Sequence, residues 1–155
     1  MAEKNDITNR VTSIRRTFHA PVQLVWEAWT QPEHIAQWWG PKGMEIKVVE
    51  HNFTPGGKWK YTMQMPDKSE FISEGIYSEI VELHKIITSA DFRPMTEGVV
   101  LEALFEDNGD TTEFTFNVLH SSEEYRKQQE NMGFHKGWGT VFERLDNYLV
   151  QQVGS

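Results

Sequence analysis

The chain has 155 residues, the usual length of a single domain built on one hydrophobic core. Its formal net charge of −8 excludes a protein that binds nucleic-acid phosphates through a basic surface. The absence of cysteine excludes disulfides, thiolate metal sites and cysteine nucleophiles. Residues 1–10 lack an apolar signal core and no apolar run is long enough to span a membrane. We therefore expect a cytoplasmic protein that has no membrane partner.

The first part of the chain predicts a strand followed by two short helices. The segment Ile14–Phe18 has the composition of a β-strand, although its alternation is imperfect. Pro21 suits the first turn of a helix, and apolar residues then recur at helical spacing as far as Thr30. Pro32 suits the start of a second helix, which Gly40 and the proline after it end.

From residue 44 the apolar period changes to two, the period of a strand. The clearest strand begins at Lys58 and places Trp59, Tyr61 and Met63 on one face. Asn108-Gly109 is a strong signal for a hairpin turn. The other predicted strands cover residues 44–48, 71–80, 82–90, 98–106 and 111–119.

The C-terminal segment Ser121–Gln152 predicts one long helix. A hydroxyl and a carboxylate three residues apart, at Ser121 and Glu124, are typical of a helix start. Apolar residues then form one broad stripe: Phe134, Trp138, Val141, Phe142, Leu145, Tyr148 and Leu149. Glycines within this stripe, at 133, 137 and 139, indicate close approach of either a neighbouring backbone or a ligand.

This order of elements predicts an α+β fold. We expect residues 1–6 to form a flexible tail and residues 7–152 to form a single domain. A run of hairpin-connected strands twists and curls, and its inner face can wrap around the final helix. The pattern therefore predicts a curved antiparallel sheet of about seven strands, with a cavity between the sheet and the helix.

Several short motifs also occur in a specific order and spacing. They are Phe18–Pro21, Val25–Thr30, Pro32–Glu33, Trp38–Pro41, Pro55–Trp59, Gly75–Ile80, Asp110–Thr112 and Gly137–Trp138. Together they resemble the AHSA-like family, homologues of the C-terminal domain of the heat-shock-protein-90 ATPase activator. That family lies within the START-like superfamily, also called SRPBCC or birch-pollen-allergen-like. The resemblance implies the helix-grip fold, with an interior cavity for apolar ligands.

The predicted cavity wall combines aromatic and thioether side chains, which suit apolar ligands. The candidate ligand-binding residues are Trp59, Tyr61, Met63, Phe71, Tyr77, Phe92, Met95, Phe134, His135 and Trp138. The alternative for these residues is that they form an ordinary core. We expect Trp138, at the centre of the helical stripe, to be buried against the strand face that carries Trp59 and Tyr61.

The adjacent tryptophans Trp38 and Trp39 leave two alternatives open. A regular helix does not turn two successive rings toward one core. One ring then lies at the cavity mouth or on the surface, as a lid or a partner contact; alternatively, both rings plug the end of the sheet. No histidine pair has the spacing of a zinc helix, so we expect no metal and no cofactor.

We therefore expect a non-enzymatic protein that binds a small apolar or amphipathic molecule. One alternative is a protein-interaction module that assists a chaperone, as the resemblance implies, through the loop at Trp38 and Trp39. A second alternative is an enzyme that acts on an enclosed apolar substrate, with His135 or a tyrosine of the cavity as the acid or base. No residue is assigned a catalytic role.

Overall fold

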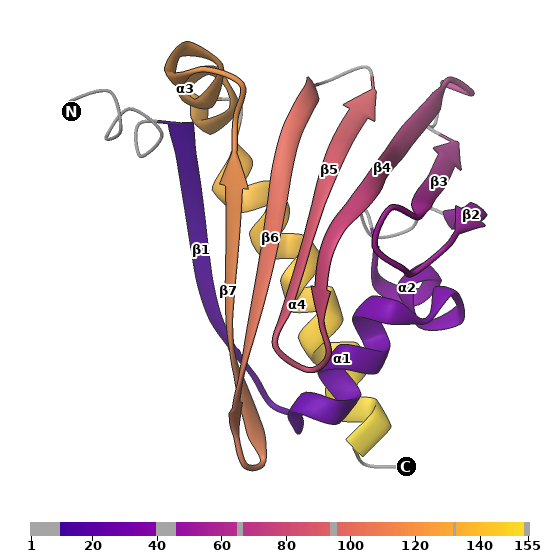
Figure 1. Ribbon diagram of the computed structural model, residues 1–155, viewed down its shortest axis with the longest axis vertical. Helices are drawn as coiled ribbons and strands as arrows, with labels where there is room; N and C mark the ends of the chain where they lie inside the picture. Colours follow the sequence, from indigo (N-terminus) through magenta and orange to yellow (C-terminus); the bar gives the residue numbers. More distant parts are fainter. Residues whose placement is uncertain (1–9, 40–45, 65–66, 94–95, 132, 154–155) are drawn as a thin grey trace.

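The computed structural model describes residues 10–39, 46–64, 67–93, 96–131 and 133–153 (Figure 1). Its elements in chain order are β1 (Val11–Phe18), α1 (Val22–Thr30), α2 (Pro32–Trp38), β2 (Ile46–His51), β3 (Lys58–Gln64), β4 (Glu70–Val81), β5 (Lys85–Arg93), β6 (Thr96–Asn108), β7 (Thr111–Leu119), α3 (Glu123–Asn131) and α4 (Phe134–Val153). The predicted order of a strand, two short helices, a run of strands and a C-terminal helix is confirmed.

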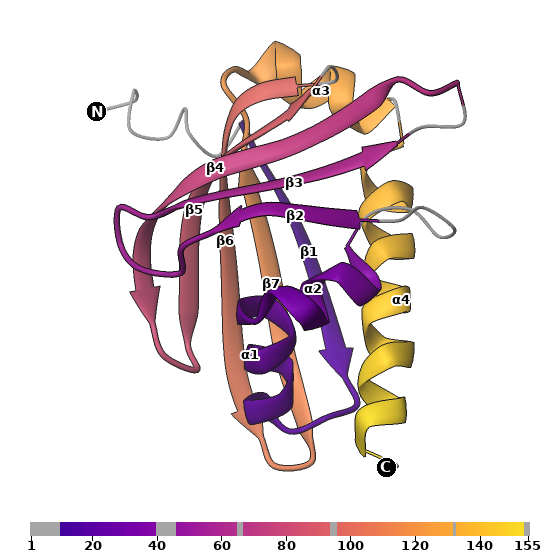
Figure 2. The same cartoon turned by 90° about the vertical axis from the view of Figure 1, so that its right-hand side faces the viewer.

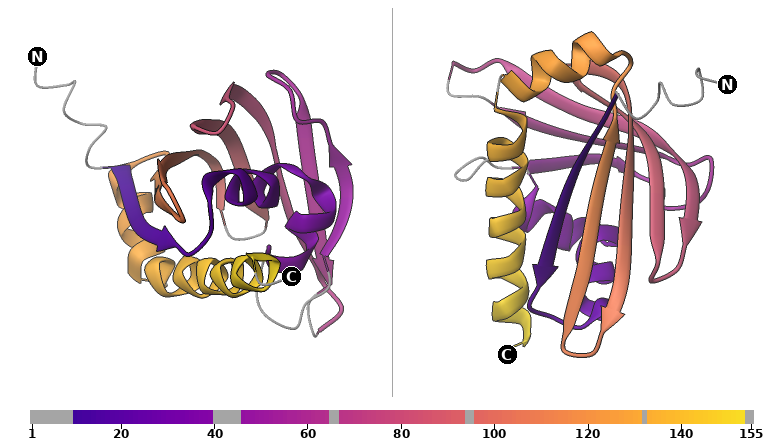
Figure 3. Two further views of the ribbon diagram at one scale, coloured as in Figure 1. Left: turned by 90° about the horizontal axis from the view of Figure 1, so that it is seen from below. Right: turned by 90° about the vertical axis from the view of Figure 1, so that its left-hand side faces the viewer.

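The strands form one antiparallel sheet of seven strands in the order β1-β7-β6-β5-β4-β3-β2. Strands β2 to β7 follow one another as hairpins, and β1 pairs with β7 at the far edge. The sheet curves so that α1, α2 and α4 all lie on its concave side (Figures 2 and 3). Helix α2 contacts both α4 and β2. The predicted α+β helix-grip architecture is therefore confirmed.

The prediction of one continuous C-terminal helix is wrong. Helix α3 ends at Asn131 and α4 begins at Phe134, because Gly133 between them has a φ of +94°, which a right-handed helix does not allow. The helix is capped one residue later than the predicted pair Ser121 and Glu124: the backbone N–H of Tyr125 donates to the hydroxyl of Ser122 at 3.0 Å. No side chain of α3 is buried. The helix lies at the end of β1 and β7 (Figure 1).

Several strand boundaries differ from their predictions, and the start of β5 has a clear structural cause. Strand β5 begins at Lys85 rather than at Glu82, because residues 82–84 form a turn in which Leu83 has a φ of +66°. An apolar residue in this conformation is uncommon, so the sequence carries no signal for the turn.

The core lies between the concave face of the sheet and the helices. Along β7 the side chains of Phe114, Phe116 and Val118 alternate with half-buried ones, as expected for a strand with one buried face. From α4, Phe142 and Leu145 are fully buried against this face. The aromatic rings meet at short distances; those of Phe116 and Phe142, for example, are 5.1 Å apart.

Gly75 fixes how closely β3, β4 and β5 approach at the centre of the sheet. A Cβ atom at this position would lie 1.9 Å from the carbonyl oxygen of Ser89 on β5. It would also lie 3.0 Å from the ring of Trp59, which pairs with Gly75 across the β3–β4 ladder. The indole of Trp59 therefore occupies the space that a side chain at 75 would need.

Candidate ligand-binding site

A small cavity lies on the concave side of the sheet, beneath α1 and α2. Its volume is about 30 Å³, enough for about one or two water molecules. Its lining is almost entirely aromatic and aliphatic: Trp29, Ile35, Trp38, Trp39, Trp59, Tyr61, Tyr77, Ile86, Thr88, Leu101, Ala103 and Phe116. None of these side chains carries a charge, so the cavity suits only uncharged molecules.

Trp39 lies at the centre of the aromatic wall. Its ring centroid is 5.9 Å from that of Trp59 and 5.6 Å from that of Tyr61. On the opposite side it is 5.9 Å from the ring of Trp138 on α4. The indole of Trp39 therefore occupies the space between the sheet and α4 in which a ligand was expected.

Both adjacent tryptophans are buried, which matches the alternative that they plug the end of the sheet. The expectation of an exposed ring is wrong because the helical geometry ends between them. Helix α2 ends at Trp38, whereas Trp39 has an extended backbone with φ −68° and ψ 133°. That change of direction turns both rings inward, and Trp38 is 0% and Trp39 7% exposed.

The two indoles are held differently. The Nε1–H of Trp38 donates to the carbonyl oxygen of Ala28 at 2.9 Å. That carbonyl would bond the N–H of residue 32 in a continuing helix, but Pro32 has no N–H to donate. Trp38 thus caps the end of α1. The Nε1–H of Trp39 has only a long bond, 3.4 Å, to the hydroxyl of Ser73.

Two further polar groups of the wall have contrasting environments. The Nε1–H of Trp59 donates to the hydroxyl of Thr88 at 2.7 Å, and this hydroxyl lies 3.0 Å from the carbonyl oxygen of Ile76. Thr88 is therefore satisfied by the protein. The Nε1–H of Trp29, in contrast, is buried and has no partner among the described residues.

His51 on β2 does not line the cavity, but it contacts Tyr61 of the wall, although it was not among the predicted site residues. Its Nε2 lies 2.7 Å from the carbonyl oxygen of Thr30, the last residue of α1, and its Nδ1 lies 2.8 Å from the hydroxyl of Tyr61. Burial lowers the pKa of His51, and the hydrogen bond to Thr30 and the charge of Glu33 partly offset this. Burial raises the pKa of Tyr61, and neighbouring Tyr77 raises it further.

A β-bulge explains why the sequence did not identify His51. The pairing of β2 with β3 shifts between Val48 and Glu50, so that His51 pairs with Trp59 and faces inward. Strict alternation from Val48 would place Glu50 inward instead. A bulge of this kind leaves no signal in a single sequence.

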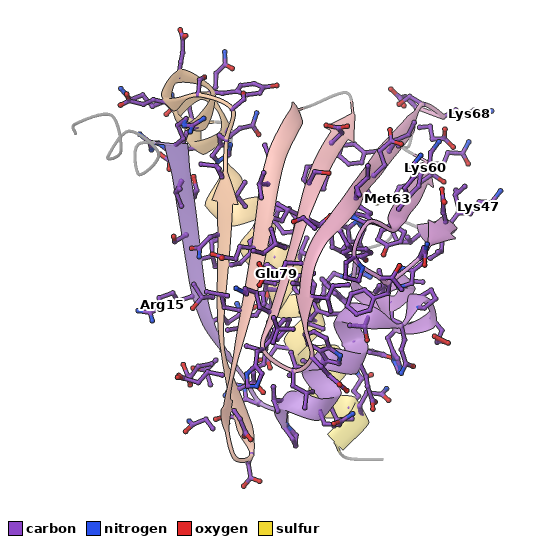
Figure 4. All side chains as sticks on the ribbon, viewed as in Figure 1. Arg15, Lys47, Lys60, Met63, Lys68 and Glu79 are labelled. Atoms are coloured by element: carbon purple, nitrogen blue, oxygen red, sulfur yellow. The ribbon has the colours of Figure 1, made fainter. Side chains whose placement is uncertain are left out.

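The other predicted residues are only partly brought together. Trp59, Tyr61 and Tyr77 line the cavity, whereas Met63 is buried on the same face of β3 without lining it (Figure 4). Phe71 and Phe92 are half-buried at the margin of the core. Met95 lies outside the described residues, as do residues 1–6, the side chains of Phe134 and His135, and the surroundings of Gly137.

Trp138 is half-buried rather than enclosed. Its ring contacts those of Phe116 at 4.8 Å and Phe92 at 5.7 Å. The ring of Trp39 contacts Trp138 and also Trp59 and Tyr61. Trp138 thus packs on the sheet as expected, with its ring on those of Phe116 and Phe92.

Within the described ranges, no group of three or more histidine, aspartate or glutamate side chains is arranged to hold a metal ion. None of the helices in this part of the chain is both long and apolar enough to cross a membrane.

Comparisons with known proteins agree with this architecture. Residues 19–150 match the model of the AHSA1 family, described as activator of Hsp90 ATPase homolog 1-like protein. A crystal structure from Nitrosomonas europaea has a TM-score of 0.82 at 28% identity, covering 95% of this chain and 98% of the other. A solution structure from Arthrobacter aurescens has a TM-score of 0.83 at 25% identity, covering 94% and 89%.

A solution structure of an AHSA1-like protein from Aeromonas hydrophila has a TM-score of 0.74 at 18% identity, covering 93% and 94% of the two chains. This last likeness concerns the fold alone. No curated protein sequence matches the chain.

Proposed function

The chain belongs to the AHSA1 family, and we propose that it binds a small, uncharged, apolar or amphipathic molecule on the concave side of its sheet beneath α1 and α2, as a binding protein rather than an enzyme. The observation that carries the proposal is a void in the aromatic core that is lined by Trp29, whose buried indole N–H has no partner among the described residues. Cores are normally filled to crystal-like density. A buried donor without a partner costs about 1–3 kcal/mol. A ligand that carries an acceptor oxygen would remove both costs.

The ligand would enter by displacing the indole of Trp39. At about 30 Å³ the cavity is too small for an aromatic ring, since a cavity of roughly 150 Å³ is needed for benzene. Among the rings of the wall, Trp39 is held by a long hydrogen bond of 3.4 Å and lies at the end of a helix in extended backbone. Trp38, by comparison, is held at 2.9 Å and is fully buried. Trp39 is thus the ring whose movement breaks the weaker hydrogen bond.

A ligand screen tests the proposal directly. Lipids, flavonoids and aromatic polyketides are added to the full-length wild-type protein, and binding is measured by tryptophan fluorescence and thermal unfolding. A ligand at one hundred times its Kd stabilises the protein by about 2.7 kcal/mol. For a protein of this size that shift corresponds to about 5–10 °C in Tm. If no apolar class changes either signal, the proposal is wrong.

Two variants separate displacement of Trp39 from a general effect of loosening the core. Trp39→Ala removes the ring that the ligand must displace, so the affinity of any ligand found should rise about tenfold, equivalent to about 1.4 kcal/mol. Trp26→Ala is the matched control, since Trp26 is equally buried at 7% but does not line the cavity. Equal changes in both variants would contradict the proposed entry route.

Chaperone assistance is a second candidate function, because the family description names activation of the Hsp90 ATPase. Both Trp38 and Trp39 are buried, so the candidate surface moves to the outer face of β2–β4. There Val49 and Ile76 are 52% and 45% exposed, and Lys47 and Lys60 belong to the same strands (Figure 4). Exposed apolar side chains among charges are common in partner surfaces.

The test of this second candidate is stimulation of an Hsp90-type ATPase by the full-length protein. Ile76→Glu should reduce the stimulation at least tenfold, equivalent to about 1.4 kcal/mol. Val150→Glu is the control, because Val150 is similarly exposed, at 49%, but lies on α4. Absence of stimulation by the wild type removes the candidate.

A further inference from the structure

A buried histidine, His120, is linked to helix α3 through the hydroxyl of a threonine. His120 follows the last residue of β7, and its backbone N–H donates to the carbonyl oxygen of Arg10 at 2.8 Å. Its Nε2 lies 3.1 Å from the hydroxyl of Thr12 on β1. That hydroxyl donates to the carboxylate of Glu130 on α3 at 3.2 Å. His120 and Thr12 are only 1% and 2% exposed, at the end of the sheet where α3 lies (Figure 1).

The chemistry of the partners fixes where the protons lie. A carboxylate only accepts and a hydroxyl has one proton, so the proton of Thr12 goes to Glu130. The Thr12 oxygen then accepts, and Nε2 of His120 is its donor. The guanidinium of Arg126, one turn earlier in α3, forms an ion pair with Glu130 at 2.7 Å. The chain of hydrogen bonds is therefore complete when His120 is neutral and carries its single proton on Nε2.

Helix α3 has the character of a surface element. None of its side chains is buried, and Gly133, with a φ of +94°, separates it from α4. The ion pairs of Arg126 with Glu130 and of Lys127 with Glu123 lie within the helix and do not attach it to the sheet. The bond from Thr12 to Glu130 joins α3 directly to β1. A change at His120, the next group in the same chain of hydrogen bonds, therefore acts where α3 meets the sheet.

We propose that His120 is a pH switch whose protonation releases α3 from the end of the sheet where β1 begins and β7 ends. The second proton would enter at Nδ1 of a ring that is 1% exposed, and the hydrogen bond from Nε2 to Thr12 would remain. The unfavourable change is thus the charge itself, because a buried charge loses its hydration. Release of α3 admits water to the ring and removes this cost.

The charged groups near His120 give the direction of the effect. Glu130 favours the imidazolium and Arg126 opposes it, but burial is the largest influence and lowers the pKa of His120 from 6.5. Both charged side chains belong to α3, so their opposing effects are lost together when the helix is released. The pKa of the hydrated ring then returns toward 6.5. The docking of α3 is therefore fully favoured above pH 6.5, and it weakens as the pH falls through the lowered pKa of the docked state.

Hydrogen exchange of the α3 amides in the full-length wild-type protein tests the switch. Protection factors, which correct for the effect of pH on the intrinsic exchange rate, are measured at pH 7.5 and at pH 5.5. Glutamate carboxyls, with an ordinary pKa of about 4.3, stay charged over this range. One histidine whose pKa is 6.5 in the released state can weaken docking by at most about tenfold over this range, and we expect a loss of at least about threefold. Unchanged protection would overturn the inference.

His120→Gln and His51→Gln form a matched pair of variants. The amide N–H of glutamine can donate to Thr12 but does not titrate, so α3 should be equally protected at both pH values in His120→Gln. His51 is a second histidine whose pKa burial lowers, and its hydrogen-bond partners, Thr30 and Tyr61, belong to α1 and β3. The loss of α3 protection should therefore persist in His51→Gln. A pH response that survives His120→Gln, or that disappears in His51→Gln, would contradict the switch.

An NMR titration of the His120 ring in the wild-type protein tests the switch even if His120→Gln does not fold. The ring should titrate with a pKa below 6.5, and the α3 amides should lose protection over the same pH range. A His120 pKa at or above 6.5 would overturn the inference, because protonation would then favour the docked helix.

Discussion

Gly75 offers the sharpest test of how the sheet creates the cavity. In Gly75→Ala the new Cβ would lie 1.9 Å from the carbonyl oxygen of Ser89 and 3.0 Å from the ring of Trp59. Ordinary contacts begin near 3.4 Å, so the backbone of β4 or β5 must move by more than an ångström. Forced overpacking costs about 1–3 kcal/mol and sometimes more. We expect about 3 kcal/mol here, because backbone atoms on both sides of the clash are held in the ladder.

Urea unfolding at pH 7.5 measures this loss, and Gly139→Ala is the matched control. Gly139 lies inside α4, and a Cβ there meets nothing within 4 Å. Alanine should therefore stabilise the protein by about 0.5–1 kcal/mol, since glycine is a poor helix former. Neutral substitutions usually change the unfolding free energy by no more than about 0.5 kcal/mol. If Gly75→Ala changes it by less than this, β4 and β5 do not approach as closely at Gly75 as the structure shows. The placement of Trp59 in the cavity wall would then be doubtful too.

Two other predictions concern the pH dependence of stability and the N-terminal cap of α3. In the folded protein the pKa values of His51 and His120 are both lowered from 6.5, in each case chiefly by burial. The stability that the two neutral imidazoles contribute is therefore fully present above pH 6.5 and is lost as the pH falls through the lowered pKa values of the folded state. The unfolding free energy should be smaller at pH 5.5 than at pH 7.5, and the double variant His51→Gln/His120→Gln should flatten that dependence; an unchanged slope would contradict it. Ser122→Ala should remove about 1 kcal/mol of local helix stability. Because no residue of α3 is buried, the effect should appear as faster hydrogen exchange of α3 amides, with little change in Tm.

Periodicity predicted the fold well where one face of an element is buried. The alternation of Trp59, Tyr61 and Met63 correctly assigned three inward residues of β3. The helical spacing that begins at Val22 correctly identified the buried face of α1, which includes Trp26. In both cases the hydrophobic period and the backbone period coincide over a whole element.

The candidate site was harder to predict because it depends on irregular backbone. Trp39 turns inward only because α2 ends one residue earlier, and His51 faces inward only because of a bulge. Gly133 was recognised as costly in a helix, but not as the point where one helix becomes two. Each feature depends on tertiary contacts that outweigh the local pattern.

The volume of the cavity could not be predicted from composition at all. Six tryptophans in one chain indicate a large aromatic core, but whether their rings leave a void depends on the rotamer of each one. The structure shows that Trp39, predicted as a lid or a plug, is the ring that fills most of the space between Tyr61 and Trp138.

The contrast between Trp38 and Trp39 decides whether the aromatic wall is only a core or also a site. Trp38→Phe removes the donor to Ala28 and leaves a buried carbonyl without a partner, because Pro32 has no N–H. An unpaired buried group costs about 1–3 kcal/mol, and the smaller ring adds the loss of packed volume, for a total of about 2–4 kcal/mol. Trp39→Phe also loses packed volume, but it breaks only a bond of 3.4 Å to Ser73 and leaves no helix carbonyl without a partner, so a smaller cost of about 1–2 kcal/mol is expected.

Urea unfolding measures the stability lost in Trp38→Phe and in Trp39→Phe. Titration of each variant with any ligand found by screening measures the change in affinity. For a binding site, the cheaper substitution, at Trp39, should raise affinity more than the costly one at Trp38, because Trp38 lines the cavity but is not the ring that the ligand displaces. A packed core without function would show the difference in stability and no change in binding for either variant. Equal stability costs would contradict the assignment of Trp38 as the cap of α1, and with it the reason why Trp39 is the ring that moves.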